Sequence, residues 1–185
     1  MALISKIFKH LRLNITKYFI LATKGTIGYA KYLGVNVGKD CRIYITRFGS
    51  EPFLISIGER VTITAGVRLL THNGSTWLIR DEKGRRFDYK PISIGNNVFI
   101  GNNSIIMPGV IIEDNVIVAA GSVVTKSIPK GYIVGGNPAK KIGLFEDYHN
   151  KALASYPSEI DKNKHSSYKQ SILEIVDKIP KPFLK

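Results

Sequence analysis

The residues best suited to chemistry lie in one polar segment near the middle of the chain. Residues 71–90 are THNGSTWLIRDEKGRRFDYK and contain His72, the only tryptophan (Trp77), Asp81 and Asp88. A neutral imidazole accepts a proton readily near neutral pH, so His72 is a candidate general base that would activate a hydroxyl group. A lone histidine is more often structural than catalytic, and loop charges are usually only solvated. The residue types alone therefore leave both interpretations open.

A six-residue repeat surrounds this segment and predicts the scaffold that positions it. From Ile94 onward the blocks are IGNNVF, IGNNSI, IMPGVI, IEDNVI, VAAGSV and VTKSIP, and earlier blocks start at Ile57 and Val37. Each block from Ile94 begins with Ile or Val. Apolar residues that recur at six predict a parallel β-helix, in which three blocks form one triangular coil of about eighteen residues. Gly and Asn at the corners supply backbone conformations that β-branched residues resist.

The repeat breaks between Leu70 and Pro91, so we expect residues 71–91 to protrude as a loop. A regular solenoid gains no stability from such an excursion. Long loops on rigid scaffolds tend to carry function. The position of His72, where a coil ends and this loop begins, therefore favours a functional role.

A known family shares these features. The hexapeptide-repeat acyltransferases, and especially the branch of maltose and galactoside O-acetyltransferases, resemble the stretch PISIGNNVFIGNNSIIMPGVIIEDNVIVAAGSVVTKSIPKGYIVGGNPAKKI. The resemblance covers Val37 to Gly143. It implies a mainly β fold, a left-handed parallel β-helix, although most parallel crossovers are right-handed. It also implies acetyl-CoA as the acyl donor, a homotrimer with active sites between subunits, and direct transfer.

The resemblance assigns the catalytic groups. His72 corresponds to the family's catalytic base, which stands at the start of the same inserted loop. The related enzymes stabilise the oxyanion of the thioester with a serine and backbone amides. The matching residue here is Asn102, whose amide can also donate a hydrogen bond. This departure changes the side chain but not the reaction class.

Three further residues are candidates for the acceptor site. The coil from Val37 to Ile57 is two residues longer than regular, and counting by coil places Glu51 beneath Thr71 and His72. In the galactoside branch an acidic residue near this place touches the acceptor sugar. Glu51 could therefore bind sugar hydroxyls, orient His72, or be a solvated corner carboxylate. Trp77 could line the acceptor site or cap the solenoid core, and Asp88 is a weaker candidate.

The resemblance also assigns the coenzyme A site. Small residues are needed where the pantetheine arm runs close to the coils, and basic groups are needed near the phosphates. A family arginine corresponds to Lys140, which lacks the bidentate fork of a guanidinium group. The expected cofactor-binding residues are Ala119, Ala120, Gly121, Thr125, Lys126, Lys140 and Lys141.

The composition limits the remaining classes of function and partner. The formal charge of +13 attracts anions such as nucleic acid, phospholipid or a phosphorylated cofactor. No nucleic-acid-reading motif accompanies that charge, so we expect no nucleic-acid partner. The single cysteine, Cys41, excludes an internal disulfide framework and a four-cysteine zinc site, and it fits a reducing compartment. No metal cluster and no signal peptide are visible, so we expect a cytoplasmic enzyme without a metal.

The two ends differ from the repeat. Residues 1–34 form one predicted segment, 35–143 the β-helix domain with its loop 71–91, and 144–185 a helical C-terminal extension. Within the first, residues 3–22 have apolar groups at helical spacing with lysines and arginines largely off that stripe. This amphipathic helix could cap the open end of the solenoid, or lie on the inner face of a membrane. In the second case the acceptor could be a lipid-linked sugar.

These observations favour an acetyl-CoA-dependent O-acetyltransferase acting on a sugar or on a sugar-containing precursor of a surface polysaccharide. Two alternatives stay open: an N-acyltransferase acting on an amino sugar, and a non-catalytic β-helix scaffold. The sequence does not identify the acceptor, the acyl chain, or the partner that fixes the tautomer of His72.

Overall fold

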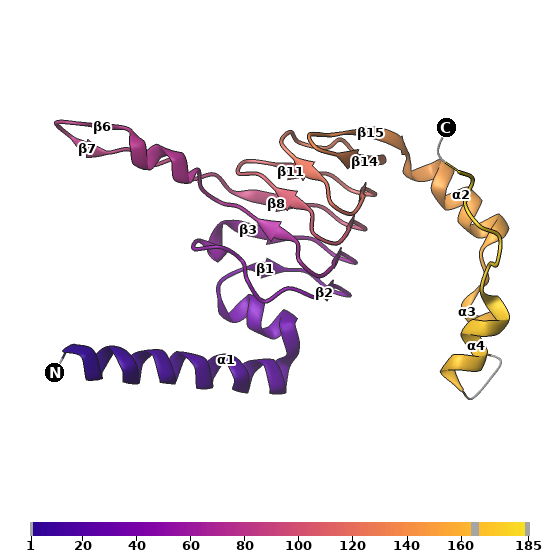
Figure 1. Cartoon of the computed structure of the whole chain (residues 1–185), viewed down its shortest axis with the longest axis horizontal. Helices are drawn as coiled ribbons and strands as arrows, with labels where there is room; N and C mark the ends of the chain where they lie inside the picture. The colour runs from indigo at the N-terminus through magenta and orange to yellow at the C-terminus, as the bar shows by residue number, and fades with distance from the viewer. Residues whose placement is uncertain (1, 164–166, 184–185) are drawn as a thin grey trace. The chain divides into compact units, whose positions relative to one another are not determined.

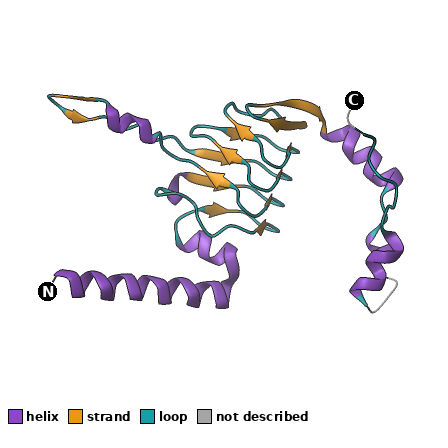
Figure 2. Ribbon diagram, in the orientation of Figure 1, coloured by secondary structure: helices purple, strands orange, loops and turns teal. Residues whose placement is uncertain are grey.

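The repeat folds into a three-sided stack of parallel strands, which confirms the predicted fold class (Figures 1 and 2). The computed structural model describes residues 2–163 and 167–183, with side chains from residue 15 onward. Its contacts divide the chain into two units, Met1–Phe145 and Glu146–Lys185. The stack of strands and the loop belong to the first unit.

Three parallel sheets form the sides of the stack. The first sheet contains β1 (Asn36–Val37), β3 (Ile55–Ile57), β8 (Ile92–Ile94) and β11 (Ile111–Ile112). The second contains β5 (Arg68–Leu69), β10 (Ile105–Ile106) and β13 (Val123–Val124). The third contains β2 (Arg42–Ile43), β4 (Thr62–Ile63), β9 (Phe99–Ile100), β12 (Ile117–Val118) and β14 (Tyr132–Gly136), to which β15 (Ala139–Leu144) adds antiparallel.

The strand register reproduces the expected coil length. Ile94 pairs with Ile112, eighteen residues further along the chain. Val37 pairs with Ile57, twenty residues further along, so the predicted two-residue excess of the first coil is confirmed. Short strands suffice because each one pairs with a strand of at least one neighbouring coil.

The core is a single column of aliphatic side chains. The first residues of the six blocks are each no more than 3% exposed; they are Ile94, Ile100, Ile106, Ile112, Val118 and Val124. Full burial of such a side chain stabilises the fold by about 1.5–3 kcal/mol. The column therefore supplies the rigidity on which a protruding loop can be held.

The corners depend on the fourth residue of each block. In five of the six blocks this residue has a positive φ, between 55° and 82°; they are Asn97, Asn103, Gly109, Asn115 and Gly121. Glycine and asparagine tolerate this left-handed conformation far better than β-branched residues do. The alternation of aliphatic strand residues with Gly or Asn corners is therefore what turns the chain every six residues.

A long helix precedes the first coil. Helix α1 (Ala2–Tyr32) is interrupted at Gly25, whose φ is 64° and ψ −170°. After this kink, Ala30 is fully buried in the core and Ile27 packs against it. The Thr26 hydroxyl donates a hydrogen bond to the Ile43 carbonyl. The residues after the kink thus cover the N-terminal end of the stack.

The stretch predicted to be amphipathic, residues 3–22, lies before the kink and is helical. Its side chains up to residue 14 lie outside the described residues. Beyond them, Ile15, Tyr18 and Phe19 are exposed and Ile20 is buried. The choice between a cap and a membrane-surface helix therefore stays a prediction for this stretch. Within the described part of the chain, no helix is both long and apolar enough to cross a bilayer.

The C-terminal unit is helical, as the sequence predicts. Helix α2 (Phe145–Ser155) begins directly after β15, and α4 (Tyr168–Ile175) lies further along the chain. A one-turn helix between them, α3 (Glu159–Lys162), was not predicted. Its N-cap, Ser158, forms a reciprocal capping box with Asp161, a pattern present in the sequence SEID.

Candidate active site

The loop leaves the stack after β5 and returns at β8, and backbone hydrogen bonds close its root. The Lys90 amide donates to the Thr71 carbonyl at 2.9 Å, and the Asn73 amide donates to the Asp88 carbonyl at 3.0 Å. Between these two bonds, His72 and Tyr89 form an antiparallel bridge. The root is therefore a short ladder that holds His72 at the edge of the rigid stack.

Beyond the root, the loop has regular structure of its own. A short 3-10 helix, η2 (Gly74–Leu78), starts at Asn73, whose side chain accepts a hydrogen bond from the Ser75 amide. The tip is an antiparallel hairpin of β6 (Arg80–Asp81) and β7 (Gly84–Arg85), labelled in Figure 1. The loop is thus an ordered arm rather than a featureless connection.

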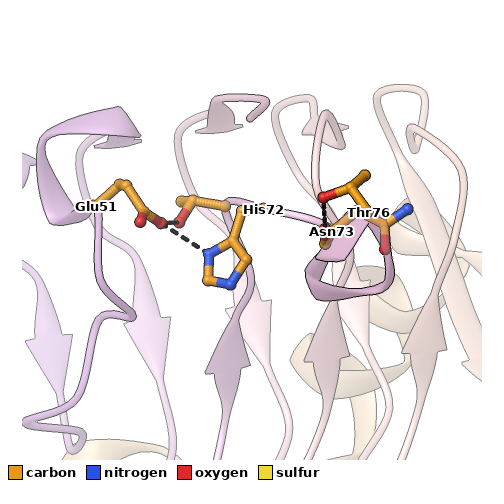
Figure 3. Close-up of polar contacts among 5 residues, drawn as sticks. Glu51, His72, Asn73 and Thr76 are labelled. Atoms are coloured by element: carbon orange, nitrogen blue, oxygen red, sulfur yellow. Dashed lines mark hydrogen bonds and ion pairs between the residues drawn. The ribbon is translucent and has the colours of Figure 1, made fainter. Parts of the chain in front are cut away.

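Glu51, Thr71 and His72 form a hydrogen-bonded group at the root of the loop (Figure 3). The Thr71 hydroxyl donates to Glu51 Oε2 at 2.7 Å, and His72 Nδ1 lies 2.9 Å from the same oxygen. Glu51 stands in the coil that is two residues longer than regular, in a segment that we call the bulge. It lies just before the 3-10 helix η1 (Pro52–Leu54). The predicted placement of Glu51 beneath His72 is confirmed by these contacts.

The charge on Glu51 is stabilised where it stands. The hydrogen bond from Thr71 lowers the pKa of the Glu51 carboxyl from its ordinary value, and the hydrogen bond and positive charge offered by His72 lower it further. Partial burial opposes this shift but does not cancel it. Glu51 is therefore a carboxylate at neutral pH, and a carboxylate can only accept hydrogen bonds.

This arrangement fixes the tautomer of the imidazole. Because Glu51 accepts, Nδ1 of His72 carries the hydrogen, and Nε2 keeps its lone pair when the ring is neutral. The side chain of His72 is 41% exposed, whereas that of Glu51 is 15% exposed. The imidazole of His72 is thus accessible while the carboxylate of Glu51 is shielded, an arrangement that suits proton abstraction from a bound molecule.

Two residues of the site were missed from the sequence. Thr71 is 1% exposed and shares Glu51 Oε2 with His72, yet it resembles any other threonine in a strand. Tyr89 pairs with His72 across the root, and their rings lie 5.9 Å apart, edge to face. Counting by coil placed Thr71 above Glu51, which precedes it by twenty residues, but did not predict their hydrogen bond, and no local pattern indicates Tyr89.

The other predicted acceptor and oxyanion residues lie apart from this group. Asn102 is an exposed corner residue whose carbonyl accepts a hydrogen bond from the Gly121 amide at 2.8 Å. Asp88 forms an ion pair with Lys90 at 3.7 Å. Trp77 is 55% exposed on the loop, so the alternative that it caps the solenoid core is wrong. The roles of Asn102 and Asp88 stay predictions.

The residues expected to contact coenzyme A lie on the last coils. Ala120 and Gly121 are exposed at a corner, and a Cβ added at Gly121 would meet no atom within 4 Å. The carbonyl of Ala119 accepts hydrogen bonds from the hydroxyls of Ser104, in the preceding coil, and of Ser122, in its own coil. The expected phosphate contacts are all exposed; they are Thr125, Lys126, Lys140 and Lys141.

A pocket of about 610 Å³ lies on the same side of the early coils as the bulge. Its lining includes Gly49 and Leu70, the near neighbours of Glu51 and Thr71, together with Arg47 and Arg68. Its walls are therefore partly basic. Among the described residues, no cluster of three or more His, Cys, Asp or Glu side chains is placed to hold a metal ion.

Comparison with known proteins decides the family. A family model described as the hexapeptide repeat of succinyl-transferase matches residues 91–126. Protein CapG of Staphylococcus aureus is 52% identical over 141 residues, which cover 74% of this chain and 82% of CapG. The galactoside O-acetyltransferase of Escherichia coli K12 is 36% identical over 97 residues, which cover 52% of this chain and 47% of that enzyme. The chain belongs to the hexapeptide-repeat acetyltransferase family.

The fold supports the same assignment. The solved structure of a galactoside acetyltransferase in complex with coenzyme A is similar with a TM-score of 0.57 and 26% identity. The match covers 80% of this chain and 85% of that one. This hexapeptide-repeat acetyltransferase is therefore an enzyme that transfers an acetyl group, and the family resemblance inferred from the repeat is confirmed.

Proposed function

We propose that this protein transfers an acetyl group from acetyl-CoA to a hydroxyl of a sugar, within a precursor of a surface polysaccharide. The observation that carries the proposal is the contact of Glu51 with His72, which leaves Nε2 of an accessible imidazole ready to take a proton. The names of two relatives in this family support a sugar acceptor: galactoside O-acetyltransferase and, in lipopolysaccharide synthesis, an O-acetyl transferase of Escherichia coli.

The chemistry is a direct transfer. Nε2 of His72 takes the proton of the acceptor hydroxyl as its oxygen attacks the thioester carbonyl carbon. Glu51 holds the ring and stabilises the imidazolium that forms. The C–S bond then breaks, and the imidazolium returns its proton to the thiolate, giving an O-acetyl ester and coenzyme A. We assign Asn102 as a side-chain donor to the transient oxyanion.

The proposed donor site runs along the last coils. Ala119, Ala120 and Gly121 offer a surface without bulky side chains, on which a thin pantetheine arm could lie. The cationic groups of Lys126, Lys140 and Lys141, with the Thr125 hydroxyl, would face the phosphates. We propose a homotrimer, in which the groove between two copies brings this surface to His72.

The deciding experiment measures thiol release from acetyl-CoA with sugars, amino sugars and sugar nucleotides as acceptors. For His72→Ala we expect kcat to fall by about 10²–10⁴, with binding of coenzyme A retained. The matched control is His149→Ala, which removes an exposed histidine of the C-terminal unit. Acetylation of an amine alone would favour N-transfer. No thiol release with any acceptor and no binding of coenzyme A would refute the enzymatic proposal.

A further inference from the structure

Arginine and aromatic side chains on the loop form a continuous stack. The guanidinium groups of Arg80 and Arg85 lie over the ring of Trp77, with Cζ at 4.4 and 4.8 Å from its centroid. The Arg85 group also lies over Phe87, at 4.4 Å. Both arginines therefore lie over aromatic rings, where the ring face attracts their positive charge.

The stack continues to the proposed base. The rings of Phe87 and Tyr89 are stacked with centroids 6.0 Å apart, and Tyr89 meets the ring of His72 at 5.9 Å. We call the six residues together the arginine–aromatic stack; they are Trp77, Arg80, Arg85, Phe87, Tyr89 and His72. It connects the tip of the loop to the site of proton transfer.

The aromatic rings of the stack face solvent. Trp77 is 55% exposed, Phe87 58% and Tyr89 49%. Burying such rings would stabilise a fold, so three neighbouring exposed rings contribute little to the stability of this one. A contiguous exposed aromatic surface is typical of a binding site, and flat rings suit the flat faces of sugars.

The positive charges of the stack are poorly compensated. Arg80 pairs directly with Arg85 across the β6–β7 hairpin, and like charges at this position destabilise a strand pair. Two of the three loop carboxylates are engaged elsewhere, Asp81 with Arg86 and Asp88 with Lys90, and the third, Glu82, lies in the turn of the hairpin. Among the described residues, the Nε of Arg85 is shielded from solvent and has no hydrogen-bond partner. An anion between the two arginines would relieve this repulsion.

We propose that loop 71–91 binds the acceptor as an acidic oligosaccharide. Its acidic groups would contact Arg80 and Arg85, because guanidinium groups bind carboxylate and phosphate through paired hydrogen bonds. Its sugar rings would pack along the aromatic rings, and its reacting hydroxyl would reach His72. The stack extends over three rings before His72, so the acceptor is a chain of sugars rather than a single one. This inference rests on the proposed sugar O-acetyl transfer.

Trp77 provides a direct probe because it is the only tryptophan of the chain. We would titrate the protein with an oligogalacturonate and, in parallel, with an uncharged maltooligosaccharide of the same length, following tryptophan fluorescence. We expect saturable binding of the acidic chain that weakens as salt is added. The neutral chain should bind at least about tenfold more weakly, which corresponds to one lost charge-assisted contact.

Variants of the two arginines test whether the acidic chain binds at these residues. The double variant Arg80→Gln/Arg85→Gln should lose about tenfold or more in affinity for the acidic chain, and Arg80→Gln alone should lose part of it. The matched control is Lys83→Gln, which removes the same charge from an exposed position of the same hairpin. It should bind within about twofold of wild type, since screened surface charges contribute little. Circular dichroism checks that the variants fold.

Kinetics separate this inference from the proposed function. In thiol release with an acidic acceptor, the double variant should raise KM for the acceptor and leave KM for acetyl-CoA unchanged. A rise in KM for acetyl-CoA instead would assign the stack to the phosphates of the donor and overturn the inference. Equal binding of neutral and acidic chains would also overturn it. Turnover of a small sugar in either case would leave the proposed function intact.

Discussion

The coils and loop 71–91 use apolar side chains for opposite purposes. In the coils, aliphatic side chains such as Ile100 and Val118 are fully buried, and every strand pairs with a neighbouring coil. In the loop, Trp77 and Phe87 are more than half exposed, and the bridge at the root joins two residues of the loop itself, His72 and Tyr89. The coils hold the fold together, whereas the loop places chemistry at its edge.

This contrast implies that stability and activity can be changed independently. A substitution in the column of aliphatic residues should affect unfolding, because a tightly packed core does not close over a cavity. A substitution at the loop or at its root should affect turnover or binding with little effect on unfolding. Each of the following experiments tests one side of that division.

The largest effect is expected in the core. Ile100→Ala removes a fully buried side chain from the column and should lower the free energy of unfolding by about 2–5 kcal/mol. Ile79→Ala on the loop, where the side chain is 59% exposed, should change it by less than about 0.5 kcal/mol. Thermal unfolding at a fixed protein concentration compares them. Similar losses in both variants would contradict the division.

The next largest effect, on turnover, is expected from a substitution at the root of the loop. Glu51→Gln keeps the shape of the side chain but replaces the carboxylate that orients His72 Nδ1. We expect kcat to fall by about 10–100-fold, as for other groups that orient a catalytic imidazole, with KM for acetyl-CoA unchanged. Glu51→Asp should recover part of the activity if the charge matters. A higher KM for the acceptor at unchanged kcat would instead make Glu51 a sugar-binding residue.

A smaller effect is expected in the pH dependence of stability. The lowered pKa of Glu51 means that its ionised form stabilises the folded state above its unfolded pKa, and that this contribution is lost as pH falls through the folded pKa. Thr71→Val removes the largest cause of the lowering, so the loss should be smaller and should be complete at a higher pH. Melting temperatures between about pH 3 and 7 test this. Identical profiles for wild type and Thr71→Val would show that the hydroxyl does not stabilise the carboxylate.

The smallest effect on stability is expected from shortening the loop. Joining Asn73 to Asp88 through Gly-Gly keeps the hydrogen bond between their backbones, since a two-residue connection can close an antiparallel pair. The free energy of unfolding should change by about 1 kcal/mol or less, because closure entropy varies slowly with loop length. Binding of the acidic oligosaccharide should be lost. Strong destabilisation would mean that the loop also supports the coils.

The coils could be predicted in detail because they repeat. The six-residue period gave the strand positions, the buried column and the excess of two residues in the first coil, all of which the register confirms. That period also placed Glu51 below His72, since stacking turns a distance along the chain into a contact in space. The position of a residue in the repeat therefore predicts which residues it contacts in neighbouring coils, even without any other structural information.

The loop could be predicted only in part. Its existence and its start at His72 followed from the break in the period, but the arrangement within it did not. The 3-10 helix η2, the β6–β7 hairpin and the stack of arginines on aromatic rings depend on contacts between residues with no fixed spacing. The bond from Thr71 to Glu51 likewise depends on a rotamer, which a repeat does not determine.

The bulge at Glu51 has a consequence for how this family diversifies. The bulge precedes β3 and the loop precedes β8, and these strands are neighbours in one sheet. The two insertions therefore open at the same corner of successive coils, one above the other. Deleting the two extra residues of the bulge would withdraw Glu51 from His72 although no residue of the loop had changed. Among relatives, we therefore expect the lengths of these two insertions to be inherited together, as one heritable unit.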